Sequence, residues 1–126
     1  MTATPAELDL LDTDVEESLR STVHELLAKR CPPERVLATY DGDRSLTGEL
    51  WASLARDLGL AGLLVPEDLG GAAATAREAA VVLEELGRAC APVPFLTSSV
   101  LATVLLRDDR TSGAAHTWGL TPTVRV

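Results

Sequence analysis

Residues 50–94 read LWASLARDLGLAGLLVPEDLGGAAATAREAAVVLEELGRACAPVP, and this stretch decides the fold. Its first part completes a helix that is predicted over residues 47–58. The apolar residues of that helix recur on one face, at Leu50, Trp51, Leu54 and Leu58. Gly59 is well placed to end the helix in the left-handed conformation, which costs glycine little.

A turn is predicted between the two helices of this stretch. Residues 60–65 make a short apolar crossing that Pro66 stops, and residues 68–71 supply a turn in which Gly70 or Gly71 can take a positive φ. A glycine-rich turn before a helix can also hold a phosphate through free backbone N–H groups. Neither GxGxxG nor GxxxxGK is present, so the sequence favours a structural turn over a phosphate site.

The second helix of the stretch has the clearest pattern in the chain. Thr75 and Glu78 have the spacing of a capping box, in which each side chain accepts a hydrogen bond from the other residue's backbone N–H. A broad apolar stripe follows, at Ala79, Val82, Leu83, Leu86 and Cys90. Pro92 and Pro94 end the helix and force an extended step.

Two further helices are predicted before this stretch. Thr13 and Glu16 have the spacing of another capping box, and the helix that they begin continues to the two prolines after Cys31. Residues 34–40 fit a short second helix, with a proline in its first turn, and residues 41–43 fit the turn that ends it. The DGD sequence of that turn lacks the further ligands of a calcium loop, so a structural turn is favoured.

A fifth helix is predicted after the proline step. Thr97 or Ser98 can cap it. Its apolar residues are Val100, Leu101, Val104 and Leu105. Beyond Arg107 neither the helical nor the strand period persists.

Together these segments predict an all-α fold, an up-and-down bundle of about five helices, over residues 13–107. Residues 1–12 are predicted to be a flexible arm and residues 108–126 an irregular tail, because neither shows a sustained apolar period. A length of 126 residues is sufficient for one core. Because aromatic residues make up only 3% of the chain and 46% of it is hydrophobic, that core is expected to consist of slim aliphatic ridges.

Charge and cysteine content exclude several classes of function. The formal net charge is -8 and the pI is about 4.6, so nucleic acid phosphates and an anionic membrane surface would be repelled. No apolar run is long enough for membrane insertion. Cys31 and Cys90 belong to no CxxC or metal-ligand motif, and they are interpreted as small apolar residues at helix ends in a reduced, cytoplasmic protein.

No residue set in the sequence is typical of catalysis. Glu84 and Glu85 are candidates for proton transfer, but successive helical residues point about 100 degrees apart and cannot face each other. Both are interpreted as solvated or salt-bridged. His24 and His116 are too far apart in the sequence to indicate a metal centre, and His24 is expected to be solvated. The serines lack the histidine and carboxylate companions of a nucleophile.

Several motifs in fixed order resemble the amino-terminal helical domain of acyl-CoA dehydrogenases. They are a Trp-x-x-Leu segment at residues 51–54, GLAG at 59–62, VPE at 65–67, GG at 70–71 and LEELGR at 83–88. The series carries the resemblance, because each motif alone is common. It covers about residues 15–106 and is tightest over residues 50–94.

The resemblance implies a domain of an FAD-dependent enzyme that dehydrogenates the α and β carbons of an acyl-CoA thioester. In that family, the helix that corresponds to the predicted fifth helix lines the acyl pocket. The candidate substrate-binding residues are therefore Phe95, Ser98, Ser99, Ala102 and Thr103. The alternative is that the hydroxyls among them only cap the helix or bind its own carbonyls.

In the same family, the catalytic base and the flavin-binding segments belong to domains that this chain does not match. The resemblance therefore implies no catalytic residue here and no binding of FAD to this chain alone. It also implies acyl-CoA as the substrate of the complete enzyme, and assembly as a homo- or hetero-oligomer. Three interpretations stay open: a truncated or frameshifted gene product, a small subunit of a hetero-oligomeric flavoprotein, and a non-catalytic helical interaction module.

Overall fold

The computed structural model describes the backbone of residues 10–112 and the side chains of residues 10–107. Within this range the regular structure is entirely helical. The α-helices are α1 (Asp14–Arg30), α2 (Pro33–Tyr40), α3 (Ser45–Ala52), α4 (Ala76–Arg88) and α5 (Ala102–Ser112). The shorter elements are the π-helices η1 (Ser53–Asp57) and η4 (Leu96–Leu101) and the 3-10 helices η2 (Leu60–Gly62) and η3 (Glu67–Leu69).

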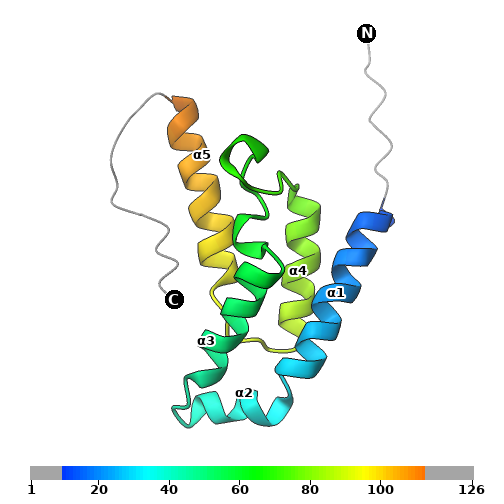
Figure 1. Ribbon diagram of the computed structural model, residues 1–126, viewed down its shortest axis with the longest axis vertical. Coiled ribbons are helices and arrows are strands. Elements are labelled where there is room, and N and C mark those ends of the chain that lie inside the picture. Colours follow the sequence, from blue (N-terminus) through cyan, green and yellow to red (C-terminus); the bar gives the residue numbers. More distant parts are fainter. Residues whose placement is uncertain (1–9, 113–126) are drawn as a thin grey trace.

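The helices form the predicted all-α, up-and-down bundle, which is therefore confirmed. In Figure 1, α1 and α4 lie side by side, and α2 crosses the lower end of the bundle between α1 and α3. The α1–α4 pair makes the most extensive contact between separate helices. No helix of the described range is both long and apolar enough to cross a membrane.

Both predicted capping boxes are present. The Thr13 hydroxyl accepts from the Glu16 N–H at 3.2 Å, and the Glu16 carboxylate accepts from the Thr13 N–H at 2.7 Å. Thr75 and Glu78 cap α4 in the same way, with the Thr75 N–H donating to the Glu78 carboxylate at 2.9 Å. Local side-chain chemistry therefore fixes where α1 and α4 begin.

The helix predicted over residues 47–58 is present, but it begins at Ser45 and becomes the π-helix η1 after Ala52. Ser53 is the first residue of the π segment, and its hydroxyl donates to the Glu49 carbonyl at 3.2 Å. Such a hydroxyl competes with the backbone N–H groups for that carbonyl. The spacing of apolar residues in the sequence does not predict this change from α-helical to π-helical hydrogen bonds.

The link between η1 and α4 depends on three glycines. Gly59 and Gly70 have φ values of 68° and 83°, as predicted for the helix end and the turn. Gly71 is required for a different reason: a Cβ at this position would lie 2.0 Å from the Val65 carbonyl oxygen. The two backbone segments of the link therefore pack against each other at a distance that only glycine allows.

The predicted cap of the last helix is wrong. Helical structure begins at Phe95, before Thr97 and Ser98. The Ser98 N–H donates to the Pro94 carbonyl at 2.9 Å, and the Thr97 hydroxyl donates to the same carbonyl at 3.2 Å. Proline has no backbone N–H group that a cap would have to satisfy. The chain therefore passes directly from the extended step into the helix.

The last helix also extends beyond its predicted end. α5 continues past Arg107 to Ser112, because no glycine or proline interrupts the sequence before residue 113. The first residues of the expected irregular tail are therefore helical. Residues 1–9 of the expected arm and residues 113–126 of the expected tail, with His116, lie outside the described residues.

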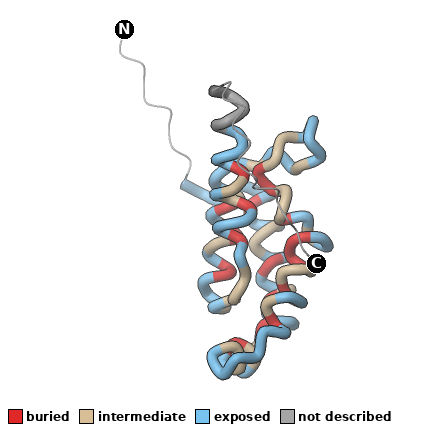
Figure 2. The backbone as a smooth tube through the Cα atoms, turned by 90° about the vertical axis from the view of Figure 1, so that its left-hand side faces the viewer, coloured by how far each residue is buried: buried red, intermediate tan, exposed pale blue. Residues whose placement is uncertain are grey.

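The core is aliphatic, as expected, with one buried phenylalanine. Its buried members are Val23, Leu27, Cys31, Val36, Leu46, Leu50, Leu54, Leu60, Leu63, Leu64, Ala79, Val82, Leu86 and Phe95. Figure 2 shows these buried positions along the inner faces of the helices. Cys90 was expected to extend the apolar stripe of α4, but the helix ends at Arg88 and the Cys90 side chain is exposed at a φ of 49°.

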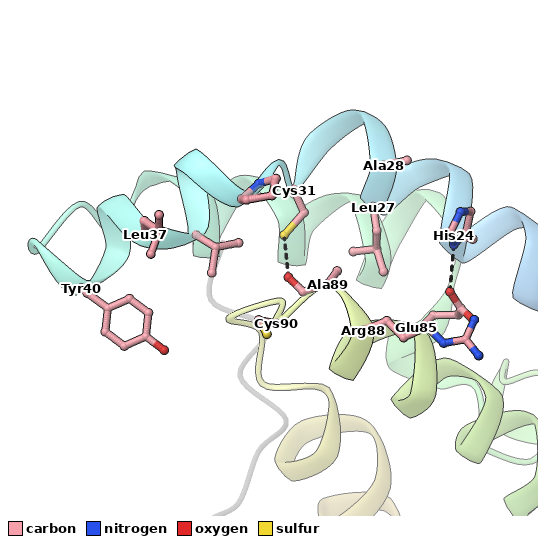
Figure 3. Close-up of a pocket in the computed structure, with 12 residues that line it drawn as sticks. His24, Leu27, Ala28, Cys31, Leu37, Tyr40, Glu85, Arg88, Ala89 and Cys90 are labelled. Carbon is pink, nitrogen blue, oxygen red and sulfur yellow. Dashed lines mark hydrogen bonds and ion pairs between the residues drawn. The ribbon is translucent and has the colours of Figure 1, made fainter.

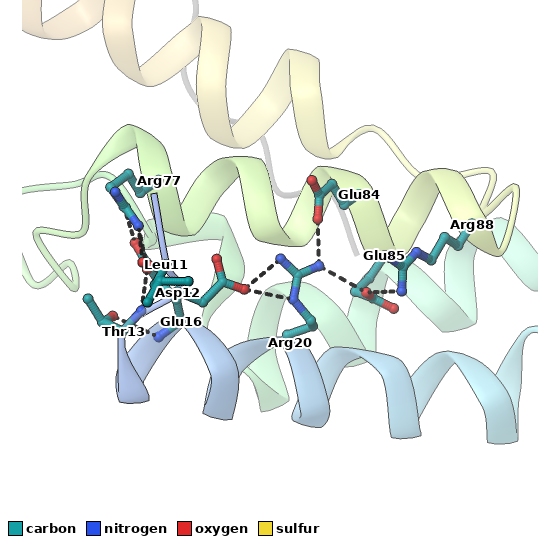
Figure 4. A network of polar contacts seen from close by, with 9 residues as sticks. All are labelled: Leu11, Asp12, Thr13, Glu16, Arg20, Arg77, Glu84, Glu85 and Arg88. Carbon is teal, nitrogen blue, oxygen red and sulfur yellow. Dashed lines mark hydrogen bonds and ion pairs between the residues drawn. The ribbon is translucent and has the colours of Figure 1, made fainter. Parts of the chain in front are cut away.

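Charged side chains join α1 to α4 along the length of the pair (Figure 4). Near the start of α1, the Glu16 carboxylate accepts from Arg77 of α4 at 2.6 Å. The hydrogen bond from Arg77 lowers the pKa of Glu16 to about 2, with help from the Thr13 N–H. Arg77 also donates to the Leu11 carbonyl at 2.7 Å, so this part of the expected flexible arm is held against the bundle.

Further along the pair, Arg20 donates to Asp12 at 2.9 Å and to both Glu84 and Glu85. Glu85 is only 1% exposed and also accepts from Arg88. His24 Nδ1 lies 3.0 Å from a Glu85 carboxylate oxygen, so the exposed His24 is paired as well as solvated.

The prediction that Glu84 and Glu85 are salt-bridged is confirmed. Burial alone raises the pKa of Glu85, but hydrogen bonds from His24 and Arg20 outweigh burial, and its pKa lies below the usual value. Glu85 is therefore an ionised structural anchor between α1 and α4.

Replacing Glu85 with alanine is expected to lower the free energy of unfolding by about 2 kcal/mol, because it removes a buried carboxylate that pairs with Arg20, Arg88 and His24. The matched control is Glu84→Ala on the adjacent, exposed residue, with an expected loss below about 0.5 kcal/mol. Urea unfolding followed by circular dichroism measures both. Equal losses in the two variants would show that Glu85 has no anchoring role.

Candidate functional site

The five candidate substrate-binding residues lie on η4, on α5 and just before them, but they do not share one face. Phe95, Ser99 and Thr103 are buried. Ser98 is exposed and Ala102 is half-buried. Phe95, Ser99 and Thr103 thus face the core, whereas Ser98 and Ala102 lie toward the outer side of the helix.

The π segment explains why the buried three are aligned. In an α-helix, residues four apart drift sideways by about 40 degrees. A π-helix has more residues per turn and drifts the opposite way. Because η4 precedes α5, the two drifts offset each other, and Phe95, Ser99 and Thr103 stay in line over two turns.

Ser99 carries the most unusual group on this line. Its side-chain oxygen is fully buried and has no hydrogen-bond partner in the described part of the chain. A buried hydroxyl without a partner costs about 1–3 kcal/mol. Such a group suits a polar partner that comes from outside the domain. It distinguishes Ser99 from Thr97, whose hydroxyl donates to the Pro94 carbonyl just before the helix.

Replacing Ser99 with alanine is expected to raise the free energy of unfolding of the chain by about 1 kcal/mol, because it removes the unpaired buried hydroxyl. Ser98→Ala makes the same chemical change at an exposed position of the same segment and corrects for helix propensity. Chemical denaturation of both variants gives the comparison. A Ser99→Ala variant less stable than Ser98→Ala would mean that the hydroxyl makes a favourable interaction.

A shallow apolar groove of about 310 Å³ runs between α4 and α5. Small residues of α4 form one side, at Ala76, Ala79 and Ala80. Val100 and Val104 form the other side. Because the alanine side chains are short, they leave space along α4 that an extended aliphatic chain could fill.

The outer side of α5 adds an exposed aliphatic face to this groove. Leu101, Val104 and Leu105, which we call the α5 face, are 50%, 52% and 61% exposed. Three large apolar side chains within two turns of one helix are unusual on a surface that faces water. The α5 face is therefore suited to cover by another domain or subunit.

The glycine turn before α4 does not fit the phosphates of FAD. The backbone N–H groups of residues 69–74 all donate to carbonyls within the same link, over 2.8–3.1 Å. Gly71 approaches the Val65 carbonyl rather than an open surface. With its donors occupied, the turn is structural, as the sequence indicated.

A second groove, of about 540 Å³, lies at the lower end of the bundle between α1, α2 and α4 (Figure 3). Leu37 and Tyr40 of α2 are exposed beside it. The sequence motifs did not predict this groove, although the i, i+3 spacing of two apolar residues on a short helix was a signal. Within residues 10–107, no three His, Cys, Asp or Glu side chains are grouped to hold a metal ion.

Comparison with known proteins agrees with this helical architecture. Residues 13–108, from the cap of α1 into α5, match the family model described as acyl-CoA dehydrogenase, N-terminal domain. The chain belongs to this family. No solved structure matches it significantly.

Three curated acyl-CoA dehydrogenases are similar to the chain. Acyl-CoA dehydrogenase IpdE2 of Mycolicibacterium smegmatis is 39% identical over 99 residues, which cover 79% of this chain and 32% of the relative. IpdE2 of Mycobacterium tuberculosis is 39% identical over 101 residues, with coverages of 80% and 32%. Acyl-CoA dehydrogenase FadE27 of M. tuberculosis is 30% identical over 113 residues, with coverages of 90% and 30%. The chain thus spans about a third of the length of these relatives.

The range that matches the acyl-CoA dehydrogenase N-terminal domain contains every element from α1 to η4 and the part of α5 up to residue 108. The groove between α4 and α5 and the α5 face both fall within it. The two capping boxes and the glycine link that hold the helices in place also lie inside the match.

Proposed function

We propose that this chain forms one wall of the acyl and flavin pocket of an FAD-dependent acyl-CoA dehydrogenase and that other domains complete the active site. The observation that carries the proposal is the exposed α5 face, which continues the apolar groove between α4 and α5. An acyl chain needs an apolar surface that excludes water. The candidates Phe95, Ser98, Ser99, Ala102 and Thr103 lie along the helix that provides it.

The chemistry of such an enzyme removes a proton from the α carbon and a hydride from the β carbon of the thioester. FAD supplies the hydride acceptor when bound. The part of this chain is to bind the acyl group and to keep water out. Its buried acids are unsuited to act as the base, because Glu16 and Glu85 lie between α1 and α4, where hydrogen bonds from neighbouring side chains lower their pKa values and occupy their oxygens.

A second candidate is a non-catalytic role, as a subunit of a hetero-oligomeric flavoprotein or as an interaction module. The same α5 face favours it, because an uncovered aliphatic surface binds partners. The two candidates differ in what covers the face. In the first it is the rest of an acyl-CoA dehydrogenase, and in the second it is a separate polypeptide.

A chimera tests the proposed wall directly. Residues 13–108 replace the matching segment of M. smegmatis IpdE2, and the purified protein is examined for flavin absorbance per chain. We expect the chimera to hold flavin at the level of the parent. Leu105→Asp on the α5 face should reduce the flavin content at least tenfold, because a charge would be buried against the neighbouring domain.

Leu37→Asp on α2 is the matched control, because it places the same charge at an exposed leucine away from the α5 face. Retention of flavin by the Leu105→Asp chimera would contradict the proposal. The isolated chain gives a second readout: wild type should self-associate and bind an apolar dye, and Leu105→Asp should do both less. A wild-type chain that is monomeric and binds no dye would contradict both candidate functions.

A further inference from the structure

Two cysteines that are far apart in the sequence meet at the lower end of the bundle. Cys31 follows α1 and is buried, and Cys90 follows α4 and is exposed. Both line the groove between α1, α2 and α4 (Figure 3). They are the only cysteines of the chain.

The contact of Cys31 places its sulfur close to Cys90. The Cys31 thiol points toward the Ala89 carbonyl oxygen, at a distance of 3.9 Å. That oxygen and the Cα atom of Cys90 belong to the same planar peptide unit. The Cys31 sulfur therefore lies beside the peptide unit that joins Ala89 to Cys90.

The backbone at Cys90 is also unusual. Cys90 has a φ of 49°, in the left-handed region that non-glycine residues rarely adopt. It sits in a turn between the end of α4 and the prolines that precede η4, outside any helix. The turn closes α4, because the Cys90 N–H donates to the Gly87 carbonyl at 3.1 Å and the Ala91 N–H donates to the Leu86 carbonyl at 2.9 Å.

We propose that Cys31 and Cys90 form a reversible disulfide when the chain meets a low-molecular-weight disulfide such as oxidised glutathione. The bond would tie the end of α1 to the turn after α4 across the floor of the groove. The proposal does not depend on the catalytic role of the domain. It changes the interpretation of the cysteines from apolar helix-end residues to a redox-sensitive pair.

The exchange proceeds in two balanced steps. The exposed Cys90 thiolate attacks one sulfur of the small disulfide, whose S–S bond breaks, and the departing thiolate takes a proton from water. Cys31 then gives its proton to solvent, and its thiolate attacks the Cys90 sulfur and expels the second small thiolate, which takes a proton from water. The protein loses two electrons and two protons, and one small disulfide becomes two thiols.

The order of attack follows from exposure. The Cys31 thiol is buried, and burial raises its pKa, so it is a poor first nucleophile. Once Cys90 carries the mixed disulfide, the reacting sulfur is delivered to Cys31 from within the same molecule. Because the Cys31 thiol must lose its proton before it attacks, the second step should become faster as the pH rises.

The test uses the full chain, reduced and diluted to low micromolar concentration, with oxidised glutathione. Free thiols are blocked with N-ethylmaleimide at intervals, and intact mass and peptide maps are recorded. The expected product has the intact mass of one chain less two hydrogens, with no disulfide between chains, takes up no N-ethylmaleimide, and yields a peptide that joins Cys31 to Cys90.

Two variants separate the steps. Cys31→Ala should stop at the mixed disulfide on Cys90, and Cys90→Ala should react at least tenfold more slowly, because its remaining thiol is buried. Circular dichroism establishes that each variant is folded. The wild-type peptide map tests the Cys31–Cys90 disulfide independently of the variants. A wild-type chain that ends as the mixed disulfide on Cys90, or as a dimer through Cys90, would overturn the proposal.

Discussion

Replacing Phe95 with alanine is expected to lower the free energy of unfolding by about 4 kcal/mol, the largest effect of any single truncation proposed for this chain. Phe95 is almost fully buried at the start of the η4–α5 helix. Its ring is the largest fully buried side chain within the described residues. Its removal leaves a cavity between η4 and the rest of the core, and a close-packed core fills such a cavity only in part.

Leu96→Ala is the matched control, because Leu96 is the next residue and is about half exposed. We expect it to cost less than about 1 kcal/mol. Urea titrations of both variants, with circular dichroism as the signal, measure the difference. If Phe95→Ala were as stable as wild type, the core position of Phe95 would be wrong, and its only role would be in the acyl pocket.

Replacing Gly71 with alanine is expected to lower the free energy of unfolding by about 3 kcal/mol. The added Cβ would lie 2.0 Å from the Val65 carbonyl oxygen and 2.4 Å from the Val65 Cβ. Neither atom is the end of a flexible side chain. The link must therefore open, and the hydrogen bonds from the N–H groups of residues 69–74 are lost with it.

Gly87→Ala provides the control of opposite sign. Gly87 lies inside α4, where an added Cβ meets nothing within 4 Å. The same substitution should there raise the free energy of unfolding by about 0.5–1 kcal/mol, because alanine favours the helix. Thermal unfolding of the two variants should therefore move in opposite directions. A Gly71→Ala variant that melts with wild type would contradict the close packing of the link.

The sequence predicts this fold well where local chemistry decides the structure. The capping boxes at Thr13 and Thr75 and the positive φ of Gly59 and Gly70 are confirmed, because each depends on residues within one turn. The first turn of the last helix is different. It starts at Phe95, with the Pro94 carbonyl accepting from the Ser98 N–H, and residue preferences alone do not predict this start.

Tertiary contacts account for what the sequence could not predict. Nothing local to Gly71 indicates that it must approach Val65, since its own φ is not in the left-handed region. The burial of Glu85 depends on arginine and histidine side chains of α1, more than sixty residues away for Arg20 and His24. Such pairs form only when α1 and α4 pack together.

The candidate site rests on the family resemblance and stays a prediction. The resemblance identified the helix, but not which of its residues face inward. Ser98 and Ser99 are adjacent and chemically identical, yet one is exposed and the other is buried without a partner. Successive helical residues point in different directions, and the π segment η4 keeps Ser99 in line with Phe95 and Thr103; no pattern of apolar residues predicts a π segment.

The most direct test of the central claim is a flavin-binding measurement on residues 1–126 as the only protein present. The chain is mixed with FAD, and one part is passed through a desalting column while the other part is treated directly with an acyl-CoA thioester. A wall that lacks the other domains should emerge without flavin and leave added FAD oxidised. Flavin that co-elutes with the chain and is bleached by the thioester would contradict the account.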